Sequence, residues 1–286
     1  MVKTYNDLYL ETRRTLRQSD EIEDAALEAR LILCQALDCS ASELLARSHM
    51  YVGEEVTEKV RRMTERRRRG EPAAYIAGSW EFFGLPMIVD RSVLIPRMDT
   101  EVLVRKAIDT LRGRKMNARV LDLCCGSGCI GCAIGKNLPA TRLIMADISP
   151  AALSVTRRNI ALHQLSGRSV IVQADALRMP PLRLGNVDLI VCNPPYIPTA
   201  EIRTLDDSVK DWEPVLALDG GEDGLMFYRS VIDKWLSVLS DSGYVIFEVG
   251  EEQAGPVFDL MYRAGLKGLD TVRDTAGTER VVCGYK

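Results

Sequence analysis

The amino-acid sequence predicts an α/β fold built on a mostly parallel sheet, preceded by a small helical domain. From residue 100 onward, short and almost continuously apolar stretches alternate with helical segments. This alternation is typical of parallel strands that are covered by helices on both faces. Before residue 78, apolar residues recur at helical spacing and runs of β-branched residues are few. A chain of 286 residues is long enough for one large domain and a smaller partner, each with its own core.

Three segments are expected along the chain. Residues 1–78 are predicted to form the helical domain, residues 79–98 a β-hairpin linker and residues 99–286 the α/β domain. The linker begins with SWEFFGLP, in which aromatic residues precede a Gly-Leu-Pro turn. Alternating and β-branched residues follow the turn, and this order favours a hairpin.

The helical domain also carries a signal for the start of a helix. Ser40 or Ser42 is suited to cap a helix, because a hydroxyl oxygen there accepts from a free backbone N–H. Glu43 follows Ser40 by three residues, which is the spacing of a capping box.

The α/β domain is expected to contain regularly alternating elements. Strands are predicted at residues 119–123, 142–146, 169–173, 187–192, 244–249 and 280–285. Helices are predicted near residues 100–113 and 252–264, and between most of the strands.

Composition and charge exclude several classes of protein. The net charge is -3, so the chain as a whole has no general attraction to nucleic acid or to an anionic membrane. The sequence contains no run of about 18 uncharged apolar residues, and its start lacks the apolar core of a secretory signal. A cytoplasmic protein is therefore expected, with its eight cysteines as reduced thiols.

Two further clusters have an ordinary structural interpretation. Cys129 and Cys132 form a C-x-x-C pair, but no second pair or nearby histidine completes a zinc site, so we interpret them as buried packing thiols and expect no metal. Six arginines lie between Arg61 and Arg69. We interpret this run as a solvated helix face in preference to a contact with RNA or an acidic protein.

Polar residues at the ends of three predicted strands indicate a nucleoside site. In VLDLCCGSGCIG, Asp122 lies inside the first strand, and Gly126 and Gly128 open the following helix. Asp147 stands at the tip of the second strand, where a carboxylate is suited to a ribose diol. Asp175 follows the third strand, where it is suited to accept from an adenine amino group. Ligands of open α/β sheets gather at this edge.

The sequence VCNPPYIP follows the fourth strand and indicates the reacting group. Pro194 and Pro195 fix the backbone and offer no N–H donor. The Asn193 side-chain oxygen and the carbonyl after Asn193 or Pro194 therefore form a paired acceptor for both hydrogens of an -NH2 group. Tyr196 offers a flat face for a planar group. Such a poor nucleophile needs an electrophile in line, and a methyl sulfonium meets that need without a strong base.

The motifs LDLCCGSG, ADIS, QADAL and NPPY, in this order, resemble those of the class I S-adenosylmethionine-dependent methyltransferases that act on amino or amide nitrogen. The stretches EFFGLPMIVDRSVLIPRMDTEVLV and EPVLALDGGEDGLMFYRSVI narrow the resemblance to the HemK-type protein-(glutamine-N5) methyltransferases. The resemblance implies a Rossmann-like, mostly parallel seven-stranded sheet and a helical substrate-recognition domain. It also implies methyl transfer from S-adenosylmethionine to the GGQ-loop glutamine of peptide-chain release factors, with S-adenosylhomocysteine as product.

The resemblance also implies roles for individual residues. The residues implied to hold the cofactor are Asp122, Cys124, Cys125, Gly126, Ser127, Gly128, Asp147, Ile148, Asp175, Ala176 and Asn193. The residues implied to hold the glutamine amide are Asn193, Pro194, Pro195 and Tyr196. Two residues depart from the family pattern: Cys124 stands where glycine is frequent, and Met98 stands where proline is common.

Other interpretations of the same motifs stay open at this stage. A related branch of the family methylates a glutamine of a ribosomal protein. A DNA adenine N6-methyltransferase is disfavoured, because the chain is net acidic and the segment between the fourth and fifth strands is short and acidic. A non-catalytic binding module and a nicotinamide dehydrogenase fit the motifs less well. The expected partner is a release factor, without direct contact to DNA or membrane, and the expected state is a monomer.

Overall fold

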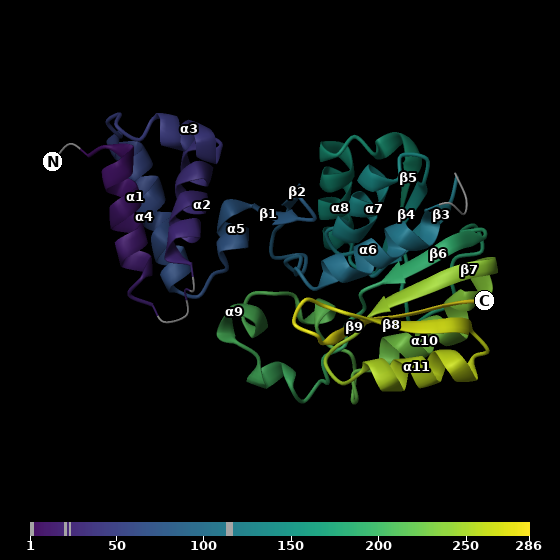
Figure 1. Ribbon diagram of the computed structural model, residues 1–286. Coiled ribbons are helices and arrows are strands. Elements are labelled where there is room, and N and C mark those ends of the chain that lie inside the picture. The colour runs from purple at the N-terminus through teal and green to yellow at the C-terminus, as the bar shows by residue number, and fades with distance from the viewer. Residues whose placement is uncertain (1–2, 20–21, 23, 113–116) are drawn as a thin grey trace. The chain divides into compact units, whose positions relative to one another are not determined.

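The computed structural model describes residues 3–19, 22, 24–112 and 117–286. The chain forms two compact units (Figure 1). The first runs to Trp80 and includes the later segment Asp206–Trp212, and the second comprises Glu81–Leu205 and Glu213–Lys286. The segment Asp206–Trp212 thus belongs to the same unit as the N-terminal residues, although the expected boundaries assign it to the α/β domain.

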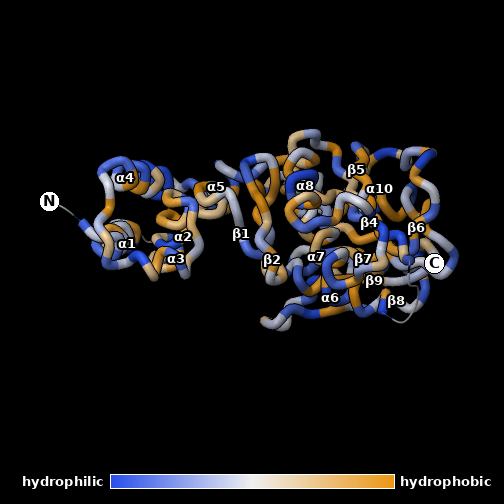
Figure 2. The backbone as a smooth tube through the Cα atoms, turned by 90° about the horizontal axis from the view of Figure 1, so that it is seen from above, coloured by the Kyte–Doolittle hydropathy of each residue, from blue (hydrophilic) through white to orange (hydrophobic). Residues whose placement is uncertain are grey.

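The first unit is helical, as the spacing of its apolar residues predicts. Its helices are α1 (Tyr5–Leu16), α2 (Ala25–Leu37), α3 (Ala41–Ala46), α4 (Glu54–Arg68), α5 (Ala73–Ala77) and α9 (Asp207–Lys210). Leu16, Ile32 and Leu33 are fully buried at the centre of its core. Helix α4 is mostly hydrophilic (blue in Figure 2), because most of its residues are arginines, glutamates or lysine, and Arg67 is the buried one among its last three arginines.

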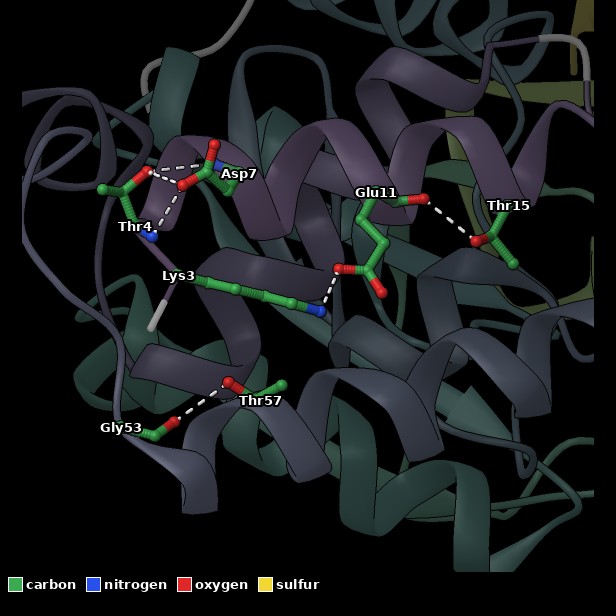
Figure 3. A network of polar contacts seen from close by, with 7 residues as sticks. All are labelled: Lys3, Thr4, Asp7, Glu11, Thr15, Gly53 and Thr57. Atoms are coloured by element: carbon green, nitrogen blue, oxygen red, sulfur yellow. Dashed lines mark hydrogen bonds and ion pairs between the residues drawn. The ribbon is translucent and has the colours of Figure 1, made fainter. Parts of the chain in front are cut away.

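Side-chain capping bonds define where α1 begins. At the start of α1, the Thr4 hydroxyl accepts from the Asp7 backbone N–H at 3.1 Å, and the Asp7 carboxylate accepts from the Thr4 backbone N–H at 2.9 Å (Figure 3). Lys3 forms an ion pair with Glu11 one helical turn further on. The two bonds between Thr4 and Asp7 satisfy backbone N–H groups that have no partner within the helix.

The predicted capping box at Ser40 is confirmed. The Ser40 hydroxyl accepts from the Glu43 backbone N–H at 3.2 Å, and the Glu43 carboxylate accepts from the Ser40 backbone N–H at 2.8 Å. Ser40 is therefore the N-cap of α3, and Ser42 lies inside the helix.

The linker contains a two-stranded hairpin of β1 (Ser79–Phe82) and β2 (Leu85–Ile88). Phe83 and Gly84 form the turn with φ of 53° and 70°. Two positive φ angles match the right-handed twist of a hairpin. The predicted Gly-Leu-Pro turn is wrong in its position, because Leu85 and Pro86 already belong to β2.

The second unit is an α/β unit whose strands alternate with helices. The helices are α6 (Thr100–Leu111), α7 (Cys129–Asn137), α8 (Pro150–Leu162), α10 (Met226–Lys234) and α11 (Ala254–Arg263). The strands are β3 (Arg119–Leu123), β4 (Arg142–Asp147), β5 (Ser169–Gln173), β6 (Val187–Cys192), β7 (Leu239–Glu248), β8 (Lys267–Arg273) and β9 (Glu279–Tyr285). Residue 113, the last of the first predicted helix, lies outside the described residues.

Seven strands of the described chain form one sheet in the order β5-β4-β3-β6-β7-β9-β8. The first five are parallel to their neighbours, and β9 runs antiparallel between β7 and β8. The mostly parallel seven-stranded sheet implied by the family resemblance is therefore confirmed. Helices α6, α7 and α8 pack on one face of the sheet and α10 and α11 on the other (Figure 1).

The strand order brings the polar strand ends together. Leu123 at the end of β3 is paired with Ala146 of β4 on one side and with Cys192 of β6 on the other. Cys192 is paired in turn with Phe247 of β7. Since these strands are parallel, the residues after each of them meet at one edge of the sheet, at the point where the strand order reverses.

Candidate active site

The turn between β3 and α7 folds back on the sheet through left-handed residues. Cys124, Gly126 and Gly128 have φ of 60°, 54° and 77°. The Cys125 backbone N–H donates to the Ala146 carbonyl at 3.0 Å, and the Gly128 N–H donates to the Cys125 carbonyl at 2.7 Å. Cys124 occupies a left-handed conformation that favours glycine. This explains why glycine is frequent at this position in the family that the sequence resembles.

The two glycines of this turn have different surroundings. A Cβ on Gly128 would lie 2.8 Å from Thr156 Cγ2 of α8, so Gly128 is needed for close packing. A Cβ on Gly126 would meet no atom within 4 Å. The space beside Gly126 is therefore open to a ligand that approaches the backbone closely.

The side chain of Cys124 belongs to the core rather than to the open side of the turn. It packs against the apolar cluster that β6, α10 and α11 share, and its thiol hydrogen-bonds with Cys192. This hydrogen bond and burial raise the pKa of the Cys124 thiol well above its ordinary value. The cysteine in the glycine position thus adds no reactive thiolate to the site.

Asp147 is the last residue of β4 and connects two parts of the site. Its Oδ2 accepts from the Gly126 backbone N–H at 2.9 Å, and its Oδ1 accepts from the Ser149 N–H at 2.9 Å. Burial raises the pKa of the carboxyl group, while these backbone bonds lower it. Each carboxylate oxygen keeps a further lone pair for a hydroxyl donor.

Asp122 lies buried beneath the turn, within β3. Its Oδ2 accepts from the Gly131 backbone N–H at 2.9 Å, whereas its buried Oδ1 has no hydrogen-bond partner among the described residues. Burial raises the pKa of Asp122 to about 7. An unpartnered buried acceptor is costly, and a donor from a ligand or water at this point would relieve it.

The loop after β5 lies next to Asp147, because Asp147 is paired with Gln173. Asp175 Oδ1 accepts from the Leu177 N–H at 2.8 Å, so this carboxylate forms a local turn. The Ala176 carbonyl accepts from Ser230 Oγ of α10 at 2.9 Å and from Nε1 of Trp235, the residue after α10, at 3.1 Å, which fixes the loop at the end of this helix.

Two other predicted residues of this edge differ in exposure. Ile148, directly after Asp147, is 42% exposed. Ser127 is buried, and its carbonyl accepts from Asn159 Nδ2 of α8 at 2.9 Å. Ile148 is therefore available to a ligand, whereas Ser127 contributes its backbone to the packing of the turn.

Asn193 follows β6 directly and is half-buried. Its Nδ2 donates to Oγ1 of Thr100, the first residue of α6, at 3.3 Å. Pro194 and Pro195 are buried after it. The structure thus brings this segment to the same sheet edge as the turn after β3, one strand away.

Tyr196 is held by a glycine-rich loop and by Gln253 of the segment before α11. The Tyr196 carbonyl accepts from Gln253 Nε2 at 2.8 Å. A Cβ on Gly220 would lie 2.7 Å from the Tyr196 backbone, and one on Gly250 would lie 3.0 Å from its ring. These glycines allow the close approach that fixes Tyr196. Burial raises the pKa of its phenol to about 12, so the ring is neutral.

Thr100 and Glu248 belong to this site, and the sequence interpretation missed both. Glu248 ends β7 and is 2% exposed. Burial raises its pKa to about 7, although hydrogen bonds from Thr100 and Asn193 lower it in part. An acid at the tip of the fifth strand, in VIFEVG, is the same signal that identified Asp147 and would have identified Glu248.

The remaining predicted features have structural partners. Of the six arginines between Arg61 and Arg69, five form ion pairs within the helical unit. The buried pair joins Arg67 and Glu28, with 2.6 Å between Nε and Oε2. The arginine run is therefore largely neutralised by its own unit.

Most of the cysteine side chains are buried. All eight cysteines are free, and Cys129 and Cys132 are buried at the start of α7. Burial raises the pKa of Cys129 to about 12. Among the described residues, no group of three or more His, Cys, Asp or Glu side chains is arranged to hold a metal ion. No helix in the described ranges is both long and apolar enough to span a membrane.

Comparison with known proteins places this geometry in a class. Residues 7–78 match the family model of the PrmC N-terminal domain, and residues 99–212 match that of the methyltransferase small domain. A methyltransferase structure from Pyrococcus furiosus superimposes with a TM-score of 0.52 at 14% identity, covering 72% of this chain and 90% of that chain. The fold and the polar edge of its sheet define a methyltransferase of the Rossmann-like type.

A relative that matches almost the whole length of this chain identifies the family. The release factor glutamine methyltransferase of Clostridium botulinum is 36% identical over 280 residues, which cover 98% of each chain. The release factor-specific protein-(glutamine-N5) methyltransferase of Alicyclobacillus acidocaldarius is 30% identical over 67% of this chain and 94% of that structure, with a TM-score of 0.42. The chain belongs to the family of release factor glutamine methyltransferases.

Proposed function

We propose that the protein transfers a methyl group from S-adenosylmethionine to the side-chain amide nitrogen of the GGQ-loop glutamine in peptide-chain release factors, releasing S-adenosylhomocysteine. The observation that carries this proposal is the pairing of β3 with β6. It brings a segment suited to a planar amide, Asn193 to Tyr196, beside the turn suited to a nucleoside cofactor. The similarity to full-length release factor glutamine methyltransferases supports the same substrate.

The residues of the turn fit S-adenosylmethionine. A Cβ on Gly126 would project into open space, as expected for a backbone against which a cofactor lies. The unpartnered Oδ1 of Asp122 is suited to an ammonium group, directly or through water. Asp147 would accept from the ribose hydroxyls, and Ile148 and Ala176 would flank the adenine. The bound cofactor supplies the electrophilic methyl sulfonium.

Asn193, Pro194 and Tyr196 would hold the glutamine amide. The Asn193 side-chain oxygen and the Pro194 carbonyl accept its two hydrogens, and the Tyr196 ring packs on its plane. This arrangement aims the nitrogen lone pair at the methyl group, and such positioning is worth about 7–11 kcal/mol of the barrier. The nitrogen loses its proton after the methyl group has transferred, so the site needs no strong base.

The helical domain, residues 1–78, is proposed to recognise the release factor, and the protein is proposed to act as a cytoplasmic monomer. Because five arginines of its basic run already have acidic partners, recognition by a general positive charge is not proposed.

Incubation with labelled S-adenosylmethionine and a set of acceptors tests the proposal. The acceptors are a release factor, the same factor with alanine in place of the GGQ glutamine, total ribosomal proteins and duplex DNA. We expect label on the unchanged factor alone. Label on ribosomal proteins instead would mean that the substrate is that of the related branch, a ribosomal-protein glutamine. Label on DNA would refute a protein substrate.

A further inference from the structure

The amide of Asn193 must be held in one of two orientations. A carboxamide is a donor at its nitrogen and an acceptor at its oxygen, and the two ends have nearly the same shape. If Asn193 accepts from a substrate -NH2 group, its Oδ1 must face the substrate. In the opposite orientation the Nδ2 hydrogens of Asn193 would face the hydrogens of the substrate -NH2 group, and no hydrogen bond could form. A neighbouring group must therefore hold the Nδ2 end in place.

Two buried groups lie at the Nδ2 end. Asn193 Nδ2 donates to Thr100 Oγ1 at 3.3 Å, and hydrogen bonding with these same two residues lowers the pKa of the Glu248 carboxyl group. Thr100 and Glu248 are each 2% exposed. A hydroxyl both accepts and donates, so Thr100 can accept from Asn193 Nδ2 and donate to the Glu248 carboxyl group at the same time.

The carboxyl group of Glu248 is incompletely satisfied by the described residues. Its Oε2 is buried and has no hydrogen-bond partner among them. Such a group is expensive to bury, and packing alone does not require a carboxylate at the end of β7. A buried acid that contacts the amide of a proposed substrate-binding residue is therefore a candidate for a role in the reaction.

We propose that Glu248 is a positioning residue that, together with Thr100, holds the Nδ2 end of the Asn193 amide, so that its Oδ1 faces the substrate glutamine. This inference rests on the proposed function. The ionised carboxyl group of Glu248 is the required form, because it accepts only. A protonated carboxyl group can donate to Oδ1 and so favours the reversed amide.

Several charged and titratable groups face Glu248 and set its ionisation. Asp99 before α6 and Arg280 of β9 act on it in opposite directions, and Tyr196, Tyr228 and Cys129 also interact with its charge. Arg280 is shared, because it also pairs with Asp99 and Asp274. With a pKa of about 7, Glu248 changes its charge in the neutral range.

The test measures steady-state methylation of a release factor between about pH 5.5 and about pH 9, together with cofactor binding by calorimetry. The variants are Glu248→Gln, Glu248→Asp and Thr100→Val, and the control is Asp270→Asn, which removes an exposed carboxylate that pairs with Lys106. We expect Glu248→Gln to lower kcat about 10- to 100-fold. Its cofactor affinity should stay within about twofold, since the affected bond is on the substrate side.

The pH profile separates positioning from a merely structural role. The wild type should lose activity as pH falls through about 7, Glu248→Asp should keep this acid limb with part of the activity, and Glu248→Gln should lack it. A Glu248→Gln enzyme with wild-type kcat, or with the same acid limb, would overturn the inference. If that variant does not fold, Thr100→Val decides: a wild-type kcat refutes the inference, and a reduced kcat with unchanged cofactor affinity supports it. Failure of the wild type itself to methylate the factor would refute the proposed function instead.

Discussion

The Asp147 carboxylate accepts a hydrogen bond from the Gly126 backbone N–H over 2.9 Å, which ties the tip of β4 to the turn that follows β3. The same carboxylate receives the Ser149 N–H at the start of α8. Asp147 therefore shapes the turn as well as offering acceptors to a ribose. A change at this residue should affect cofactor binding through both routes.

Replacing Asp147 with alanine should weaken S-adenosylmethionine binding about 10- to 100-fold, because hydrogen bonds from two hydroxyls to a carboxylate are lost. Isothermal titration calorimetry measures this directly. The control is Asp259→Asn, which changes an exposed carboxylate on α11. An Asp147→Ala protein that binds the cofactor within about twofold of the wild type would contradict the assignment of Asp147.

Gly126→Ala and Gly128→Ala form a matched pair at the same turn. Both place a Cβ on a left-handed residue, at a cost of about 1–2 kcal/mol each. Gly128→Ala also creates a contact of 2.8 Å with Thr156 Cγ2, whereas Gly126→Ala meets no protein atom. Urea unfolding should therefore show the larger loss of stability for Gly128→Ala. Calorimetry should show that Gly126→Ala binds cofactor poorly although it is folded; unimpaired binding would place the cofactor elsewhere.

Asn193→Ala should lower kcat about 10²- to 10³-fold, by analogy with the loss of one preorganised polar group. The matched control is Asn137→Ala on the exposed end of α7, where Nδ2 donates to the Ala133 carbonyl within the same helix. Steady-state methylation of a release factor is the measurement, with circular dichroism as the check of folding. Near-normal turnover of a folded Asn193→Ala protein would remove this residue from the reaction.

Asp122 and Glu248 should make the protein less stable as pH rises. Burial raises the pKa of each from ordinary values of 3.8 and 4.5 to about 7, so the folded state binds more protons than the unfolded state between these values. Their contribution to stability is complete below about pH 4 and is lost as pH rises through about 7. Asp122→Asn and Glu248→Gln should thus gain stability relative to the wild type between about pH 5 and about pH 8, by about 1–3 kcal/mol.

Urea unfolding of wild type and variants at both pH values measures this difference, with Asp270→Asn as the exposed-carboxylate control. A variant that gains nothing relative to the wild type as pH rises would mean that its carboxyl group ionises normally. For Glu248→Gln, a gain in stability with a loss of activity is expected, which no purely structural role would produce.

The parallel strands could be predicted from sequence because their short apolar runs alternate with helical segments. Strands β3, β5 and β6 begin and end where the alternation places them. Strand β8, Lys267–Arg273, could not be predicted from its residues because it is a half-exposed antiparallel edge strand of mixed polarity. Strand β7 starts at Leu239, five residues earlier than expected, since a register shift lets the polar stretch before Tyr244 extend the pairing with β6.

The polar residues at strand ends could be predicted, but their partners could not. Asp122, Asp147 and Asn193 follow apolar runs, and the parallel sheet brings them to one edge. Thr100 has no such signal, because its role depends on how the start of α6 packs on β6 and β7. The position of Asp206–Trp212 in the helical unit could not be predicted either. It depends on packing between residues far apart in the sequence: Trp212 Nε1 lies 3.3 Å from the point where a Cβ on Gly70 would be.

The most direct test of the proposed reaction is tandem mass spectrometry of a release factor after incubation with the wild-type protein and S-adenosylmethionine. We expect the mass of one added methyl group on the GGQ glutamine side chain, absent when Asn193→Ala replaces the wild type at equal concentration and time. A methyl group on any other residue, or equal modification of the glutamine by Asn193→Ala, would contradict it.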